Sequence, residues 1–181
     1  DHGQWETILT ELIKRNGGGD LSIYLQVTRG PAARDHAFPE DSAPTVFVMC
    51  SPIKPVPENL AAEGVAAITL DDIRWRHCNI KAITLLPNIL LRQNAVDAGA
   101  VEAILIRDGR VTEGAASNVF AVLDGVVVTP AAAADLLPGI TRDLVLELAS
   151  KHAIACREGL ITEDDIHRAD EVWLTSSTKE I

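Results

Sequence analysis

A run of prolines near residue 55 constrains this chain more than any other feature of its sequence. The segment 51–59 reads SPIKPVPEN and holds three prolines in nine residues. Proline lacks a backbone N–H and has a fixed φ, so this density excludes a helix or a central strand. It is typical of an extended linker. We therefore predict two parts: residues 1–50, the back half of a small N-terminal domain, and residues 60–181, a larger domain.

The N-terminal part contains one helical pattern and two strand patterns. Apolar residues fall on one helical face between Trp5 and Ile13, and the sequence NGGG at 16–19 ends that helix. Residues 21–29 and 45–50 are rich in β-branched and aromatic side chains, which predicts two strands.

The larger part mixes strands with helices. We predict strands at 65–70 and 171–175, and two hairpins whose turns are the Asp-Gly pairs at 108–109 and 124–125. Thr162, followed by three acidic residues, predicts the start of a short helix. The hairpins imply mostly antiparallel pairing, so the predicted class is α+β.

Two longer helices are predicted in the same part, each from its apolar spacing. Residues 85–98 should form a helix whose inward residues are Leu86, Ile89, Leu90 and Ala95. A second helix should follow Pro138 and Gly139, with Leu144, Val145 and Leu148 on one face.

Composition excludes several classes of protein. Apolar residues make up 47% of the chain, which is too many for a disordered protein. The net charge of -10 argues against a nucleic-acid partner, although a small phosphorylated ligand needs only a local cluster of donors. The three cysteines lack metal-ligand spacing, so we predict reduced thiols and no metal. No apolar run reaches the length of a membrane span, and we expect a cytoplasmic protein. The chain opens at Asp1 and stops at Ile181, directly after a predicted strand, so we expect a piece of a longer protein.

Lys81 is the most distinctive candidate for chemistry among the lysines. It lies in the apolar sequence IKAI, where an amine would lose solvation of its charged form and its pKa would fall. A neutral amine can attack a carbonyl and form a Schiff base. The alternative is a surface lysine whose stem packs on apolar neighbours while its head reaches water.

Four other segments carry polar groups that could bind a ligand or a charged partner, although each could also be an ordinary structural or solvated segment. Glu113 follows a predicted strand and is either buried against a cation or part of a simple turn. The sequence LPGIT at 137–141 opens a helix, whose free N–H groups suit a phosphate. The hydroxyls of TSST at 175–178 could donate to the same group. Arg34 and His36 lie two residues apart in a loop, where they could bind a carboxylate or simply be solvated.

Together these segments resemble the fold-type IV pyridoxal-phosphate enzymes, the branched-chain and D-amino-acid aminotransferase family. The sequence DIRWRHCNIK at 72–81 resembles the active-site lysine segment of the family, and TEGAASNVF at 112–120 resembles its cofactor-ring segment. LPGITR at 137–142 resembles its phosphate-binding turn, and TSST at 175–178 its final hydroxyl loop. Within the family, YLQVTRG at 24–30 followed by RDH at 34–36 is most similar to D-amino-acid (D-alanine) aminotransferases.

The resemblance implies a fold and a cofactor. The fold would be an incomplete small α/β domain joined to a larger domain of barrel-like antiparallel strands flanked by helices. The cofactor would be pyridoxal 5'-phosphate, held covalently by Lys81 with Glu113 on its ring nitrogen and Arg74 near its ring hydroxyl. The implied phosphate-binding set is Leu137, Ile140, Thr141, Ser177 and Thr178.

The resemblance also implies a reaction. The enzyme would be a homodimer that moves an amino group from a D-amino acid to a 2-oxo acid, with Lys81 as the catalytic acid and base. Arg34 and His36 would reach in from the partner subunit to bind the substrate carboxylate. The present stretch alone would be inactive, since the family's N-terminal segment contributes to the site.

The sequence is also compatible with other functions. The same scaffold could serve an aminodeoxychorismate lyase, which eliminates pyruvate, or an L-branched-chain aminotransferase. A non-catalytic binding protein would be expected to lack Lys81 or Glu113, and both are present.

Overall fold

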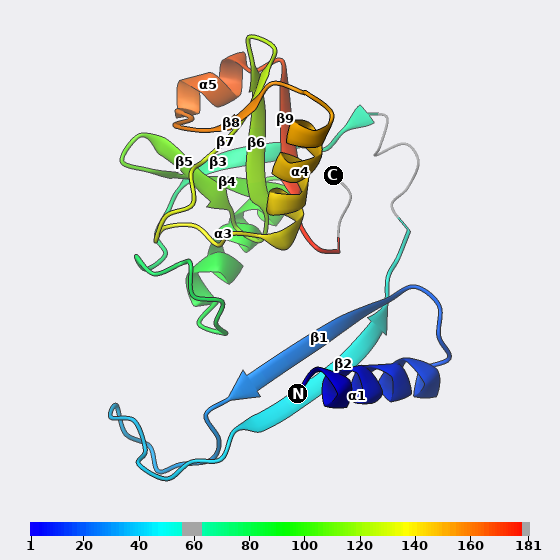
Figure 1. Cartoon of the computed structure of the whole chain (residues 1–181). Coiled ribbons are helices and arrows are strands. Elements are labelled where there is room, and N and C mark those ends of the chain that lie inside the picture. Colours follow the sequence, from blue (N-terminus) through cyan, green and yellow to red (C-terminus); the bar gives the residue numbers. More distant parts are fainter. Residues whose placement is uncertain (56–62, 179–181) are drawn as a thin grey trace. The chain divides into compact units, whose positions relative to one another are not determined.

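The computed structural model describes residues 1–55 and 63–178, and the chain divides into two compact units, Asp1–Pro55 and Val56–Ile181 (Figure 1). Part of the predicted linker, residues 56–59, lies outside the described residues. No helix in the described part of the chain is both long enough and apolar enough to cross a membrane.

The first unit consists of one helix and one antiparallel pair of strands. Helix α1 (His2–Arg15) begins at a capping box in which the Asp1 side chain accepts from the Gln4 backbone N–H. Strands β1 (Leu21–Thr28) and β2 (Thr45–Pro52) pair over their full lengths. The predicted strand ended at Cys50, but β2 continues through Pro52. Proline is tolerated there because β2 has a single neighbouring strand and Pro52 is its last residue.

The second unit contains two sheets with helices around them (Figure 1). The first sheet has the order β3-β4-β5, and its strands are β3 (Ala67–Asp71), β4 (Glu102–Arg107) and β5 (Arg110–Gly114). Helix α3 (Leu86–Asp97) is the crossover between the parallel strands β3 and β4. Strands β4 and β5 form the predicted hairpin, and the positive φ of Asp108 and Gly109 suits its tight turn.

The second sheet has the order β8-β7-β6-β9. Its strands are β6 (Asn118–Leu123), β7 (Val126–Thr129), β8 (Cys156–Glu158) and β9 (Glu171–Thr175). Helix α4 (Ile140–Lys151) connects the parallel strands β7 and β8, and the short helix α5 (Glu163–Arg168) precedes β9. Four of the six strand pairs are antiparallel, so the predicted α+β class is confirmed. Strand β8 and the two parallel pairs were not predicted.

Strand β4 lies at the centre of the larger unit because both of its faces are buried. Ile104 and Ile106 point to one face, where they pack with Val119, Val128 and other buried residues of the second sheet. Ala103 and Leu105 alternate to the opposite face and pack against α3. The two sheets therefore share one core, and β5 and β6 are held next to each other around residues 113–118.

The prediction of the inward face of α3 was wrong except for Ala95. The buried residues are Leu91 and Ala95, whereas Leu86, Ile89 and Leu90 are 67%, 61% and 50% exposed. Apolar residues occur on several sides of this helix, so spacing alone does not identify the buried side. The small Ala95 lets the helix approach Ala103 of β4 closely, which selects that side.

Candidate active site

Glu113 is a buried carboxylate at the end of β5 and receives three hydrogen-bond donors. Its residue is 6% exposed, and one carboxylate oxygen accepts from Arg74 Nη1. The other oxygen accepts from Asn118 Nδ2 at 3.2 Å and from the Leu137 backbone N–H at 3.0 Å. Glu113 is therefore in a strand and buried against a cation, which excludes the simple turn. Burial raises its pKa, and Arg74 opposes that rise.

Asn118 joins three segments that the sequence separates. Its Nδ2 donates to the Leu137 carbonyl at 2.8 Å as well as to Glu113, and its backbone lies opposite Thr175 in the pairing of β6 with β9. A side chain at Gly139 would nearly overlap Asn118 Oδ1. Glu113, the turn before α4 and the start of the hydroxyl segment thus meet around Asn118.

The region around Asn118 contains several hydrogen-bond donors that have no acceptor within the described residues. Helix α4 begins after Gly139, which supplies no side-chain cap, so the N–H groups at its first turn are free for a ligand. The hydroxyls Thr175 Oγ1 and Ser176 Oγ are buried and have no partner in the described part of the chain. Buried hydroxyls and a helix N-terminus suit an anion with several oxygens. Of the predicted phosphate-binding residues, Leu137 and Thr141 are half-buried, while Ile140, Ser177 and Thr178 are exposed.

Arg74 connects Glu113 to a second buried carboxylate. Its Nε and Nη2 bond the two oxygens of Asp72, each at 2.9 Å, in a bidentate pair, and its Nη2 also donates to the Asp135 carbonyl at 3.2 Å. Burial by itself would raise the pKa of Asp72, but the hydrogen bonds and charge of Arg74 outweigh burial and lower it. The same two carboxylates raise the pKa of Arg74. Since a guanidinium has five N–H groups, one N–H on Nη1 remains for a ligand beside Glu113.

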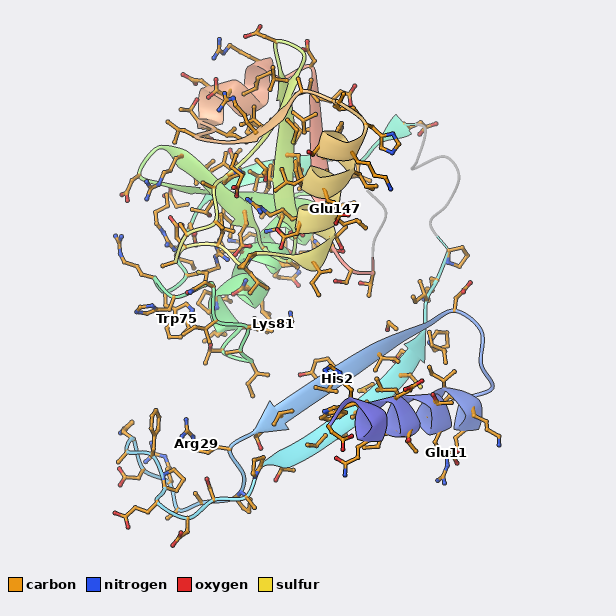
Figure 2. The ribbon with its side chains drawn as sticks, in the orientation of Figure 1. His2, Glu11, Arg29, Trp75, Lys81 and Glu147 are labelled. Atoms are coloured by element: carbon orange, nitrogen blue, oxygen red, sulfur yellow. The ribbon has the colours of Figure 1, made fainter. Side chains whose placement is uncertain are left out.

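Lys81 is exposed, contrary to the predicted apolar surroundings. It lies on the loop between β3 and α3, on which Figure 2 also labels Trp75. Its neighbours Ile80 and Ile83 are 53% and 63% exposed, so nothing within the described ranges packs over them. In residues 1–55 and 63–178, Lys81 makes no hydrogen bond or ion pair. The loop is tied to the rest of the unit by the Asn79 N–H, which donates to the Ala134 carbonyl at 3.2 Å.

Arg34 and His36 are exposed on the connection between β1 and β2 in the first unit. The His36 backbone N–H donates to the Asp35 carboxylate at 2.6 Å. Nearby, the Arg29 guanidinium lies 3.7 Å from the centroid of the Phe38 ring.

Asp72, Arg107 and Asn118 are the site residues whose roles the sequence did not predict. Asp72 is two residues before Arg74 on an extended segment, and that spacing was the available signal. Arg107 and Asn118 reach the site only through strand pairing. The roles of these two residues therefore follow from tertiary structure and leave no local pattern in the sequence.

Substituting Gly139 by alanine should destabilise the larger unit. The new methyl group meets Asn118 Oδ1, and this amide cannot move without losing its bonds to Glu113 and Leu137. We expect a loss of about 1–3 kcal/mol in the free energy of unfolding, measured by urea denaturation. Gly3→Ala is the matched control, since its methyl group makes only an ordinary contact in α1, and it should be neutral or slightly stabilising. Equal stability of the two variants would show that the turn has room for a side chain.

The free energy of unfolding should also fall in acid because of Asp72. The pKa of this carboxyl is lowered in the folded protein. Its contribution is therefore complete above its ordinary pKa near 4 and is lost as pH falls through the lower folded value. Urea unfolding at a series of pH values should show this loss, and Asp72→Asn should remove that part of the slope. An unchanged slope in Asp72→Asn would contradict the assignment.

Known protein families and sequences match this chain over nearly its whole length. Residues 1–181 match the family model described as Amino-transferase class IV. The chain is 44% identical over 173 residues to D-alanine aminotransferase of Bacillus licheniformis. This alignment covers 96% of this chain and 61% of that protein. The chain thus spans about three-fifths of the length of the curated relatives it matches.

Solved structures share the fold. A hypothetical aminotransferase from Mycobacterium tuberculosis in its PLP-bound form superimposes with a TM-score of 0.80 at 26% identity, over 98% of this chain and 65% of that one. The branched-chain aminotransferase of Thermoproteus uzoniensis, solved with norvaline, superimposes with a TM-score of 0.83 at 26% identity. The match covers 97% of this chain and 60% of that one. With a family model matched from end to end and this fold, the chain belongs to the class IV aminotransferases.

Proposed function

We propose that the whole protein transfers an amino group from a D-amino acid, such as D-alanine, to a 2-oxo acid with pyridoxal phosphate as cofactor. The family uses this cofactor, and the Bacillus licheniformis relative is a D-alanine aminotransferase. The observation that carries the proposal is the cluster around Asn118, where a buried carboxylate, a free helix N-terminus and unpartnered hydroxyls meet.

The residues of this cluster fit the cofactor. The buried hydroxyls of Thr175 and Ser176, with the first turn of α4, supply donors for a phosphate. Glu113 is a buried carboxylate that can pair with a protonated ring nitrogen, and the remaining N–H of Arg74 is available for the ring hydroxyl. Leu137, Ile140, Thr141, Ser177 and Thr178 are also proposed to hold the phosphate.

Each residue would have a distinct role in the reaction. When bound, pyridoxal phosphate supplies an electron sink for the substrate's Cα. Lys81 would hold the cofactor covalently and, when free, move the proton at the substrate's Cα. Glu113 would keep the ring nitrogen protonated, and Arg74 would fix the Glu113 carboxylate in place.

We further propose that the protein is a cytoplasmic homodimer in which Arg34 and His36 bind the substrate carboxylate from the partner subunit. Both side chains are exposed, and a guanidinium can bind a carboxylate with two hydrogen bonds. The apolar residues left exposed on and before α3 support a subunit interface, since large exposed apolar patches mark association sites. They are Ile80, Ile83, Leu85, Leu86, Ile89 and Leu90. In this organisation, residues 60–181 would form the cofactor-binding domain, and residues 51–59, of which the first two also end β2, would link it to the small domain.

An L-branched-chain aminotransferase is the second candidate, because the Thermoproteus uzoniensis enzyme shares the fold. The test incubates the whole protein and pyridoxal phosphate with D-alanine, L-alanine or an L-branched-chain amino acid, each with a 2-oxo acid other than pyruvate, and separately with aminodeoxychorismate. The 2-oxo acid formed from each substrate is measured. We expect pyruvate from D-alanine alone. Product from an L-branched-chain amino acid alone would favour the second candidate, and pyruvate from aminodeoxychorismate alone would favour a lyase.

A further inference from the structure

Arg107 is a buried guanidinium to which the proposed chemistry assigns no role. It is the last residue of β4, its side chain is 7% exposed, and its Nη1 has no partner in residues 1–55 and 63–178. Its Nη2 lies 2.9 Å from Asp72 Oδ2 in an ion pair, and it donates to the backbone carbonyls of Arg74 at 3.0 Å and of Trp75 at 3.4 Å. Burying a cation is costly, and the cost is offset only where its partners are well placed.

Arg107 is the outer end of a chain of alternating charges that leads to Glu113. Arg107 forms an ion pair with Asp72, both oxygens of Asp72 accept hydrogen bonds from Arg74, and Arg74 donates to Glu113. The exposed fractions of these four side chains lie between 0% and 7%, so water screens their charges poorly. Two cations and two carboxylates give no net charge. Thr112 adds a neutral hydroxyl bond of 2.9 Å to Asp72.

We propose that Arg107 is a positioning residue that acts through Asp72 to orient Arg74, so that Arg74 can oppose protonation of the buried Glu113 carboxylate. The part of this inference that concerns the bound cofactor rests on the proposed function. Arg107 does not contact Glu113, and its effect passes along the two ion pairs. Its two carbonyl bonds also fix the backbone at residues 74–75, at the start of the loop that carries Lys81.

Charge counting gives the consequence of removing Arg107. Without its cation, Asp72 and Glu113 share a single guanidinium, and two close carboxylates that share one cation bind a proton more readily. Other titratable groups face the cluster: buried Cys78 lies close to it, and Asp71, Arg76 and Asp108 are exposed at its edge. The Asp135 carboxylate is 3.4 Å from exposed Arg110. Arg76 and Arg110 are cations, but within the described residues neither forms an ion pair with Asp72, whose partners are Arg74 and Arg107.

The first test uses the protein without cofactor. Arg107→Met removes the charge. Arg107→Lys keeps the charge but removes the guanidinium, whose Nη2 donates to both carbonyls. Arg110→Met removes an exposed arginine from the same hairpin as a control. In Arg107→Met, we expect the Asp72–Glu113 pair to bind a proton with a raised pKa in the folded protein. Such a group stabilises the folded protein fully below its ordinary pKa, and this stabilisation is lost as pH rises through the raised value. Between about pH 4 and pH 7, we expect the ratio of folded to unfolded protein in Arg107→Met to fall about tenfold relative to Arg110→Met.

Arg107→Lys should follow the pH dependence of the control within about twofold. If Arg107→Met does not fold, Arg107→Gln makes the same charge change while keeping an amide that can donate to the carbonyls. Equal losses in the neutral and lysine variants at every pH would overturn the proposal, because Arg107 would then act only by packing and carbonyl bonding.

The second test uses the protein with bound pyridoxal phosphate. The pH midpoint of the cofactor's absorption band should rise by about one unit in Arg107→Met and stay near the wild-type value in Arg107→Lys and Arg110→Met. An unchanged midpoint in Arg107→Met would overturn the influence on the cofactor. Absence of any cofactor band in the wild-type protein would instead contradict the proposed function, and the cofactor-free measurement would still decide the role of Arg107.

Discussion

Replacing Lys81 by alanine in the whole protein should lower the rate of transamination by roughly 10²–10⁴-fold or more, because general acid–base catalysis of the proton transfer at the substrate's Cα is lost. The same variant should lose the covalent link to pyridoxal phosphate. Lys81 is exposed and makes no hydrogen bond or ion pair in the described parts of the chain. The free energy of unfolding of the cofactor-free protein should therefore stay within about 0.5 kcal/mol of the wild type.

Lys151→Ala is the matched control for this experiment. Lys151 is also an exposed lysine and lies in the last turn of α4. Steady-state rates with D-alanine should be unchanged in Lys151→Ala and almost lost in Lys81→Ala. If Lys81→Ala keeps the wild-type rate, another group moves the proton and the assignment of Lys81 is wrong.

Replacing Arg74 by methionine should cost about 3–5 kcal/mol of unfolding free energy, since it removes one partner from two buried ion pairs. Asp72 and Glu113 would then lie buried without the cation that joins them. Methionine keeps most of the apolar volume of the arginine stem, so the measured loss reports mainly on charge. Urea denaturation of the cofactor-free protein gives the value.

Arg168→Met provides the comparison with an exposed pair. The Arg168 side chain is 73% exposed and lies 2.6 Å from Asp165 in α5. Its loss should cost less than about 1 kcal/mol, as is usual for pairs at the surface. A cost for Arg74→Met no larger than that of Arg168→Met would contradict the description of the buried cluster.

The sequence was sufficient for features that depend on neighbouring residues. The Asp-Gly turns at 108–109 and 124–125 were predicted because only a few residue types accept the positive φ of such turns. The start of α5 was predicted because Thr162 can cap it, and the structure confirms the cap with its bond from the Asp165 N–H. These interactions act over a few residues and leave a local pattern.

Features that depend on tertiary packing were harder to predict. The prediction of the buried side of α3 was wrong for Leu86, Ile89 and Leu90, because the side that packs against β4 is the one with Leu91 and Ala95. Strand β8 is only three residues long, and its parallel pairing with β7 depends on α4 between them. Arg107 gave no signal because its partner Asp72 is 35 residues away in sequence and meets it only when β3 and β4 pair.

Attachment of the cofactor to Lys81 is the central claim, and borohydride reduction tests it most directly. The whole protein is incubated with pyridoxal phosphate, reduced so that the covalent link becomes permanent, digested with trypsin and analysed by mass spectrometry. Trypsin cleaves after Arg76 and Arg92 but not after a modified Lys81, so we predict the label on the peptide of residues 77–92. Label confined to another lysine, such as Lys151, or no label at all would contradict the account.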